Sequence, residues 1–113
     1  MEREAPASIE AAAEWLRKHF AAERARGVSV VYELELTGPA GGLLQLRIED
    51  GRLELGRGRA PRSDVRFRLA ATDWFGILAG RENAELLFMA GRIQVEGDRA
   101  LAVKLGSYFA RHV

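Results

Sequence analysis

The chain has 113 residues, of which 48% are hydrophobic and 29% are charged, with a formal net charge of +1. That length predicts one domain, residues 1–113, which buries roughly two-thirds of its unfolded surface. The near-zero net charge gives no global positive field, so nucleic acid is not expected as a partner. The absence of cysteine excludes disulfides and thiol chemistry.

The first residues lack the signature of a targeting segment. Met1-Glu2-Arg3-Glu4 is followed by no apolar stretch of signal-peptide type, and no run of residues approaches membrane-spanning length. We therefore expect a soluble, cytoplasmic protein.

The N-terminal part predicts one amphipathic helix. Ser8 is placed to cap it, Gly27 is placed to end it, and Trp15 flanks its apolar face. Four apolar residues recur at helical spacing on that face: Ile9, Ala13, Leu16 and Phe20.

Four strands are predicted next, each from a period-two alternation of apolar and polar residues. Residues 28–37 form the longest, and the glycine-rich segment 38–42 turns the chain. Leu44, Leu46 and Ile48 mark the second strand, and Asp50-Gly51 is a tight-hairpin signal before a third strand at 53–55. These three predict an antiparallel meander. Residues 64–69 form the fourth strand, with these side chains inward: Val65, Phe67 and Leu69.

The last part predicts three helices and one strand. Helices are expected at residues 72–79 and from Ala84, a strand at 92–96, and a final amphipathic helix from Asp98 to His112. The polar cap is missing at Ala70 and Ala71, so we expect the first of these helices to start at Thr72 or Asp73. The overall prediction is an α+β fold, a five-stranded largely antiparallel sheet with helices packed on one face.

The C-terminal half carries more bulky apolar residues than its short helices need for packing. If the N-terminal helix already covers the inner sheet face, a surplus remains that could line a pocket, although composition alone favours a filled core. An acyl chain placing about ten methylenes in such a pocket would gain up to roughly 8 kcal/mol before ordering costs.

Several short motifs carry a family resemblance. Asp64-Val65 opens a strand, Gly80 closes a helix, and three further segments follow in order, 88–93, 95–98 and 102–105. Together they resemble the sterol carrier protein 2 family, in a small bacterial-type single-domain form. Asn83-Ala84 stands where that family often has Asp-Pro, and nothing in these residues selects a sterol.

The resemblance implies an apolar tunnel that is closed by the C-terminal helix and holds a sterol, fatty acid or fatty acyl-CoA. We expect the function to be non-catalytic binding and carriage of a long-chain lipid, which is a fatty acid, fatty acyl-CoA, sterol-like or isoprenoid molecule. Transient contact to membranes or lipid-metabolising enzymes is expected, and no metal or cofactor. The predicted ligand-binding residues are Trp74, Phe75, Leu78, Leu87, Phe88, Met89, Leu101, Leu105, Tyr108 and Phe109.

Three alternatives remain open. The first is an accessory lipid-binding factor in isoprenoid-quinone biosynthesis, and the second is an enzyme that uses Asp73 or Tyr108 on an apolar substrate. The third is an interaction module that binds no lipid. His19 and His112 offer no triad or metal-ligand spacing and are expected at the surface.

A basic stretch lies between Arg57 and Arg68, with five arginines against the single acid Asp64. It could hold an acyl-CoA phosphate, an acidic phospholipid surface or a nucleic-acid backbone. A solvated loop and strand face is the favoured interpretation, because acids on neighbouring strands can pair with the arginines: Glu33, Glu35, Glu49 and Glu54.

Overall fold

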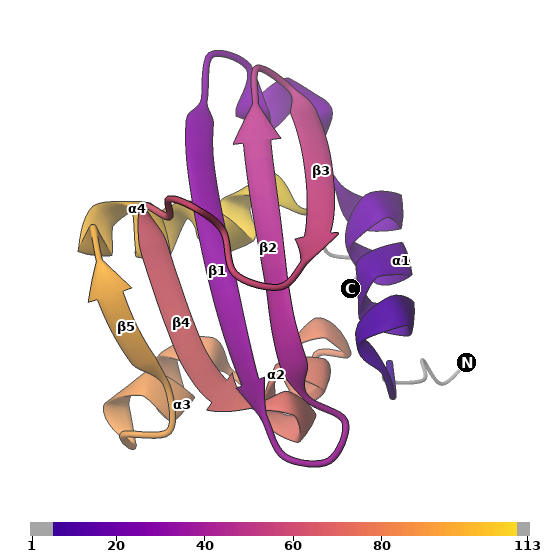
Figure 1. Cartoon of the computed structure of the whole chain (residues 1–113), viewed down its shortest axis with the longest axis vertical. Helices are drawn as coiled ribbons and strands as arrows, with labels where there is room; N and C mark the ends of the chain where they lie inside the picture. The colour runs from indigo at the N-terminus through magenta and orange to yellow at the C-terminus, as the bar shows by residue number, and fades with distance from the viewer. Residues whose placement is uncertain (1–5, 111–113) are drawn as a thin grey trace.

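A computed structural model describes residues 6–110 and shows one sheet with helices on one of its faces (Figure 1). The strand order is β3-β2-β1-β4-β5. The strands are β1 (Ser29–Thr37), β2 (Gly42–Glu49), β3 (Arg52–Arg57), β4 (Val65–Ala70) and β5 (Gln94–Gly97).

Four α-helices and two 3-10 turns lie around the rear of the sheet in the view of Figure 1, so the predicted α+β class and one-sided helical layer are confirmed. They are α1 (Ile9–His19), η1 (Ala22–Ala25), α2 (Ala71–Leu78), α3 (Ala84–Met89), α4 (Arg99–Lys104) and η2 (Leu105–Tyr108).

The first three strands form the predicted antiparallel meander. Asp50 and Gly51 connect β2 to β3 with positive φ angles of 45° and 80°, the backbone of a type I′ hairpin turn. β4 then pairs parallel with β1, aligning Tyr32 with Val65, while β5 pairs antiparallel with β4. The connection from β3 to β4 therefore crosses in front of β2 and β1, on the face opposite the helices (Figure 1).

The predicted end of the first helix at Gly27 was wrong. α1 ends at His19, and Phe20 adopts an extended conformation that forms an isolated bridge with Phe109. The amide of Ala21 also donates to the carbonyl of Tyr108 at 2.8 Å. A pairing with the end of the chain therefore replaces the next helical turn, which local spacing cannot reveal.

The final helix is also shorter than the predicted span from Asp98 to His112. Asp98 caps α4 as expected, accepting hydrogen bonds from Ala100 and Leu101, but the α-helix ends at Lys104 and a 3-10 turn follows. Gly106 has poor helix propensity, and the Ser107 hydroxyl donates to the Lys104 carbonyl at 2.6 Å, a local competitor for the helical hydrogen bond. His112 lies outside the described residues.

α2 begins at Ala71, not at the predicted Thr72 or Asp73, and it does so without a side-chain cap. The preceding strand β4 runs directly into it at Ala70, so the sheet fixes where the helix starts. α3 follows the sequence prediction, with the Asn83 side chain accepting a hydrogen bond from the Leu86 amide.

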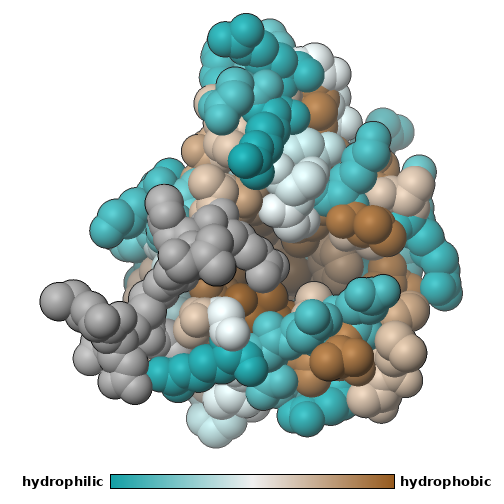
Figure 2. Space-filling model, turned by 180° about the vertical axis from the view of Figure 1, so that it is seen from behind, coloured by the Kyte–Doolittle hydropathy of each residue, from teal (hydrophilic) through white to brown (hydrophobic). Residues whose placement is uncertain are grey.

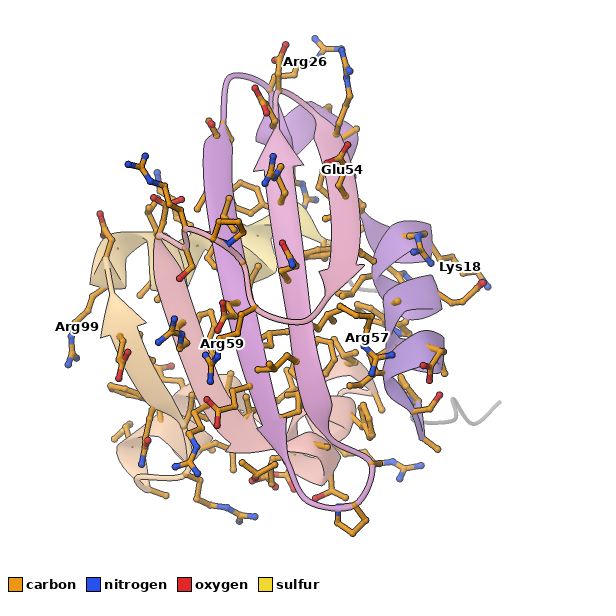
Figure 3. All side chains as sticks on the ribbon, viewed as in Figure 1. Lys18, Arg26, Glu54, Arg57, Arg59 and Arg99 are labelled. Carbon is orange, nitrogen blue, oxygen red and sulfur yellow. The ribbon has the colours of Figure 1, made fainter. Side chains whose placement is uncertain are left out.

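The outer face of the sheet is less exposed to solvent than the alternation of apolar and polar residues along the strands predicts. Glu33 points away from the helices, yet it is completely buried beneath the β3–β4 connection. Its carboxylate accepts hydrogen bonds from Arg59 at 2.9 Å, Arg66 at 3.0 Å and the Ala60 amide at 3.0 Å. Glu33 therefore ties the crossing segment to β1; Arg59 lies in front of the strands in Figure 3.

Tyr32 joins the sheet to the C-terminal segment, because its buried hydroxyl donates to the Leu101 carbonyl at 2.6 Å. Burial, aided by nearby Tyr108, Asp64 and Asp98, raises the pKa of Tyr32 well above its usual range. We expect Tyr32→Phe to lower the free energy of unfolding by about 1 kcal/mol near neutral pH.

The pH dependence checks this assignment. A folded pKa above the unfolded value gives stability that is complete below pH ~10 and falls as the pH rises further, because only the unfolded phenol then ionises readily. Urea unfolding at several pH values should therefore show a shallower alkaline decline for Tyr32→Phe than for the wild type. Parallel declines would contradict the raised pKa.

Candidate ligand-binding cavity

A cavity of about 640 Å³ lies between the helical face of the sheet and the surrounding helices. Figure 2 views the molecule from that side and shows a central hollow with hydrophobic residues along its walls. The lining residues are Trp15, Leu16, Leu34, Leu46, Phe67, Leu69, Trp74, Ile77, Leu78, Ala84, Glu85, Phe88, Ile93, Val95, Arg99, Ala102, Val103, Leu105, Gly106 and Phe109.

The inner face of the sheet forms one wall of this cavity. Leu34, Leu46, Phe67 and Leu69 project from three neighbouring strands, β1, β2 and β4. The assumption that the N-terminal helix covers this face was therefore wrong. α1 contributes Trp15 and Leu16 at the side of the space instead of filling it.

Half of the predicted ligand-binding residues line the cavity. These five are Trp74, Leu78, Phe88, Leu105 and Phe109. They come from α2, α3, η2 and the residue after η2, so the fold brings together segments more than 30 positions apart. Ligand contact at these five positions stays a prediction.

The other five predicted residues lie elsewhere. Phe75, Leu87 and Tyr108 are buried in the packed core without lining the cavity, and Met89 is 74% exposed on the outside of α3. Leu101 is half-buried and uses its carbonyl to accept the Tyr32 hydroxyl. Helical periodicity separates buried from exposed positions, but it cannot separate a side chain that meets a cavity from one that meets the core.

The lining residues that the sequence analysis missed include apolar residues expected in the core and small residues. Phe67 and Leu69 were predicted to point inward, and Trp15 was placed beside the helix core, but none was assigned to a pocket. The alternation in the strands was the available signal. The small residues Ala84, Ala102 and Gly106 carry no such signal. They line the cavity because they are too small to fill it.

Two charged side chains belong to the lining, Glu85 of α3 and Arg99 of α4. The Arg99 guanidinium carbon lies 5.9 Å from the centre of the Phe88 ring, so Arg99 reaches from α4 towards α3 at the edge of the cavity. Figure 3 shows Arg99 at the outer edge of the molecule beside β5. The rest of the lining is uncharged, so Glu85 and Arg99 are the two lining side chains that could interact with a charged group of a ligand.

Asp73, considered above as a residue that could act on an apolar substrate, is held in an ion pair. It is 6% exposed and accepts from Arg92 at 2.8 Å, and neither residue lines the cavity. Within residues 6–110 no group of three or more His, Cys, Asp or Glu side chains is placed to hold a metal ion. Neither Asp73 nor Tyr108, the two residues considered for the enzyme alternative, therefore lies at the cavity wall.

The basic stretch between Arg57 and Arg68 is largely matched by acids. Arg59 and Arg66 meet Glu33, Arg68 meets Glu35 at 3.2 Å, and Arg57 meets Glu10 of α1 at 2.7 Å. The predicted pairing across the sheet is confirmed for Glu33 and Glu35. This supports the interpretation of the stretch as a loop and strand face.

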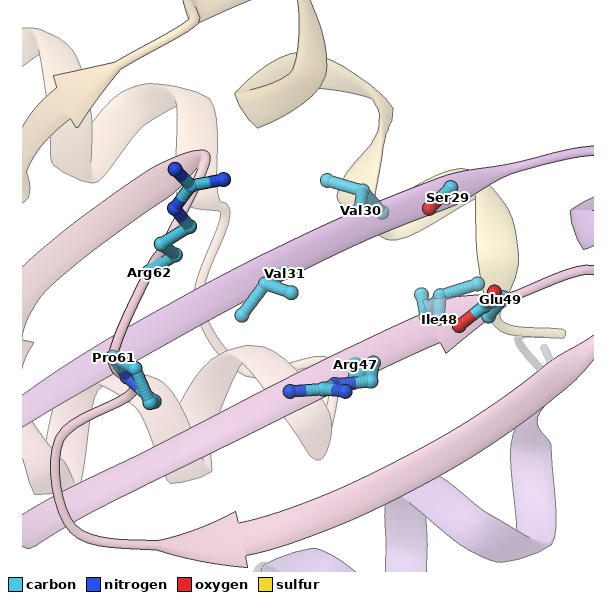
Figure 4. Close-up of a pocket in the computed structure, with 8 residues that line it drawn as sticks. All are labelled: Ser29, Val30, Val31, Arg47, Ile48, Glu49, Pro61 and Arg62. Carbon is cyan, nitrogen blue, oxygen red and sulfur yellow. The ribbon is translucent and has the colours of Figure 1, made fainter.

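A smaller depression of about 290 Å³ lies on the outer sheet face beside the crossing segment. Figure 4 shows Val31 between Arg62 of the segment and Arg47 of β2, with Glu49 farther along β2. The two arginines do not converge on a common point there.

None of the helices in the described part of the chain is long and apolar enough to cross a membrane.

Together, the fold and the cavity define a class of protein: a single-sheet α+β domain whose helices enclose an apolar pocket. Residues 11–110 match the model of the SCP-2 sterol transfer family. The chain therefore belongs to that family, which confirms the resemblance drawn from the sequence. The family is one of lipid binding or transfer, and its fold is generally non-catalytic.

Similar proteins include much longer ones. Hydroxysteroid dehydrogenase-like protein 2 of Mus musculus is 32% identical over 84 residues, covering 74% of this chain but 17% of the mouse protein. The chain thus matches only a small part of that relative. A double mutant of the sec-alkylsulfatase PisA1 from Pseudomonas sp. gives a TM-score of 0.81 at 15% identity, over 92% of this chain and 16% of that one.

Two solved structures match over most of their own length. Palmitated SCP2L2 from Aedes aegypti gives a TM-score of 0.63 at 21% identity, over 87% of this chain and 93% of that one. The UbiJ-SCP2 ubiquinone synthesis protein gives 0.59 at 20% identity, over 78% and 73%. At these identities the likeness shows the shared fold.

Proposed function

We propose that the chain binds one long-chain lipid in the 640 Å³ cavity and carries it in a form shielded from water. The observation that supports this most directly is the cavity itself, because its volume lies in the range of small-molecule sites and its walls are overwhelmingly apolar. About ten buried methylenes would contribute up to roughly 8 kcal/mol before ordering costs, enough for micromolar affinity.

The relatives support a lipid ligand and favour a linear chain as the first to test. The Aedes aegypti protein is described as palmitated, and palmitate is a fatty acid. A fatty acid would place its tail among the sheet leucines and Phe67, with its carboxylate towards the end that carries Arg99. This orientation leaves the charged group where water and a cation can reach it.

Displacement of a fluorescent fatty acid from delipidated protein tests the proposal. Unlabelled palmitate should compete at micromolar concentration, and native mass spectrometry of the undelipidated protein should show a co-purified lipid. A chain that releases no lipid and binds neither fatty acids, acyl-CoA, sterols nor isoprenoids would contradict the function.

A second candidate is an accessory lipid-binding role in isoprenoid-quinone biosynthesis. The observation that favours it is the structural likeness to the ubiquinone synthesis protein. The mass of the co-purified lipid separates the two candidates, since an isoprenoid-quinone precursor supports the accessory role and a fatty acid or acyl-CoA supports general carriage.

The charges of Arg99 and Glu85 at the cavity predict a preference for a fatty acid over an uncharged lipid of the same length. Arg99→Gln should weaken binding of palmitate severalfold, because it removes the cation nearest the expected carboxylate, and Glu85→Gln should strengthen it by a smaller factor. Hexadecanol, which has the same chain and no charge, is the matched control ligand. Fluorescent-probe displacement checks both, and equal effects on acid and alcohol would contradict this orientation.

A further inference from the structure

The large hydrophobic side chains that are exposed in the described residues are concentrated on two helices. Leu86 is 63%, Phe88 41%, Met89 74% and Val103 84% exposed. The first three belong to α3 and the last to α4. We call these four residues the α3–α4 patch. A soluble domain rarely leaves such a group in water unless the surface meets something.

The α3–α4 patch is continuous with the cavity. Phe88 and Val103 are members of the patch and also line the cavity, one from each helix. Figure 2 shows hydrophobic residues on the surface beside the hollow. A lipid that enters between these helices would therefore pass from one apolar surface to another.

The size of the α3–α4 patch argues against a second copy of the chain as its partner. Four side chains offer on the order of a few hundred Å², whereas a standard protein interface buries ~800 Å² on each partner. Insertion into a lipid surface has no such minimum, because each protruding apolar side chain is transferred into the acyl region by itself.

The charges around the patch indicate what kind of lipid surface it fits. Arg92 is paired with Asp73, Glu96 lies 3.5 Å from Arg66, and Asp98 caps α4. The remaining exposed charges nearly balance: Arg81, Arg99 and Lys104 against Glu82 and Glu85. This differs from a polybasic patch, which binds anionic membranes by net charge.

We propose that the α3–α4 patch docks on zwitterionic phospholipid bilayers by apolar insertion and so places the cavity mouth against the lipid. The purpose of this docking rests on the proposed function, but the docking itself needs no bound ligand. Its dependence on lipid charge and on salt is weak, because the local charges cancel.

Co-sedimentation of delipidated protein with phosphatidylcholine vesicles tests the proposal. The double variant Leu86→Asp and Met89→Asp should lower the partition coefficient at least tenfold. The control Ala11→Asp and Ala22→Asp adds the same charge at exposed positions of α1 and η1, and it should stay within about twofold of the wild type. Leu86→Phe with Met89→Leu should retain binding, which separates apolar insertion from a loss of folding.

Three results would overturn the proposal. One is equal vesicle binding by the patch variant and the wild type, and another is a steep increase when anionic lipid is added. The third is a wild-type dimer in sedimentation velocity that the patch variant converts to a monomer. Probe displacement without vesicles is measured separately, so a failure of lipid carriage is distinguished from a failure of docking.

Discussion

Ala102→Trp is expected to lower the affinity for a fluorescent fatty acid at least tenfold while the chain remains folded. Ala102 lies on α4, is half-buried and lines the cavity. An indole built from this position occupies the space between α4 and the sheet, where the acyl chain is proposed to lie. The loss comes from steric exclusion, so it should appear equally with fatty acid and fatty alcohol probes.

Lys104→Trp is the matched control, because Lys104 belongs to the same helix, is exposed and does not line the cavity. Its affinity should match that of the wild type. Thermal unfolding gives a second, independent result for Ala102→Trp. An open cavity accepts the indole without loss of stability, whereas a filled core would be overpacked at a cost of about 1–3 kcal/mol.

A strongly destabilised Ala102→Trp would therefore favour the filled-core alternative raised by the composition. Unchanged probe affinity in a stable variant would instead place the lipid somewhere other than this cavity. The two measurements together test the assumption that the helices leave usable space against the sheet.

The strands could be predicted from sequence because their determinants are local. Alternation placed Val30, Tyr32, Leu34 and Leu36 on one face of β1, and all four are buried there. The Asp50-Gly51 turn fixed the β2–β3 register in the same way. Each feature depends on neighbouring residues and on backbone preferences that the sequence displays directly.

The wrong end of the first helix has a cause that is not local. Phe20 leaves the helix to form a bridge with Phe109, nearly 90 residues away, and their rings lie 5.7 Å apart. The same contact holds the end of η2 against the end of α1. Helical spacing in the N-terminal segment contains no information about this pairing, so the first helix was predicted too long.

The existence of an apolar cavity was predicted, but only some of its lining residues were. Composition alone favoured a filled core, and the family resemblance implied an apolar tunnel, to which Met89 was assigned and Leu34 was not. In the sequence, Leu34 shows the same alternation as any buried strand residue. Whether it packs in the core or lines the cavity depends on where α1 lies. Met89 looks like a core residue, and its 74% exposure depends on how α3 is turned.

The two faces of the sheet are packed differently and contribute differently to stability. The helical face keeps an open apolar space, which removes packing that other domains of this size use for stability. On the opposite face the β3–β4 connection, Glu33 and two arginines form a buried, hydrogen-bonded cover. We infer that this cover supplies part of the stability that the open face lacks.

Glu33→Ala should accordingly lower the free energy of unfolding by about 3 kcal/mol, since it removes a fully buried carboxylate and leaves the Ala60 amide without its acceptor. For a domain of this size that corresponds to a fall in melting temperature of roughly 10 °C. Glu33→Gln keeps the side-chain shape but loses the charge, so an intermediate loss is expected. Calorimetry or urea unfolding measures all three proteins.

Glu35 provides the control that makes this prediction specific. It lies two residues along β1 on the same face and pairs with Arg68, but its side chain is 31% exposed. Glu35→Ala should therefore cost less than about 1 kcal/mol. Neither variant should change fatty-acid affinity, because both residues face away from the cavity. Equal stability losses would mean that the cover contributes no more than an exposed ion pair, and the helical face would then have to account for the stability of the fold.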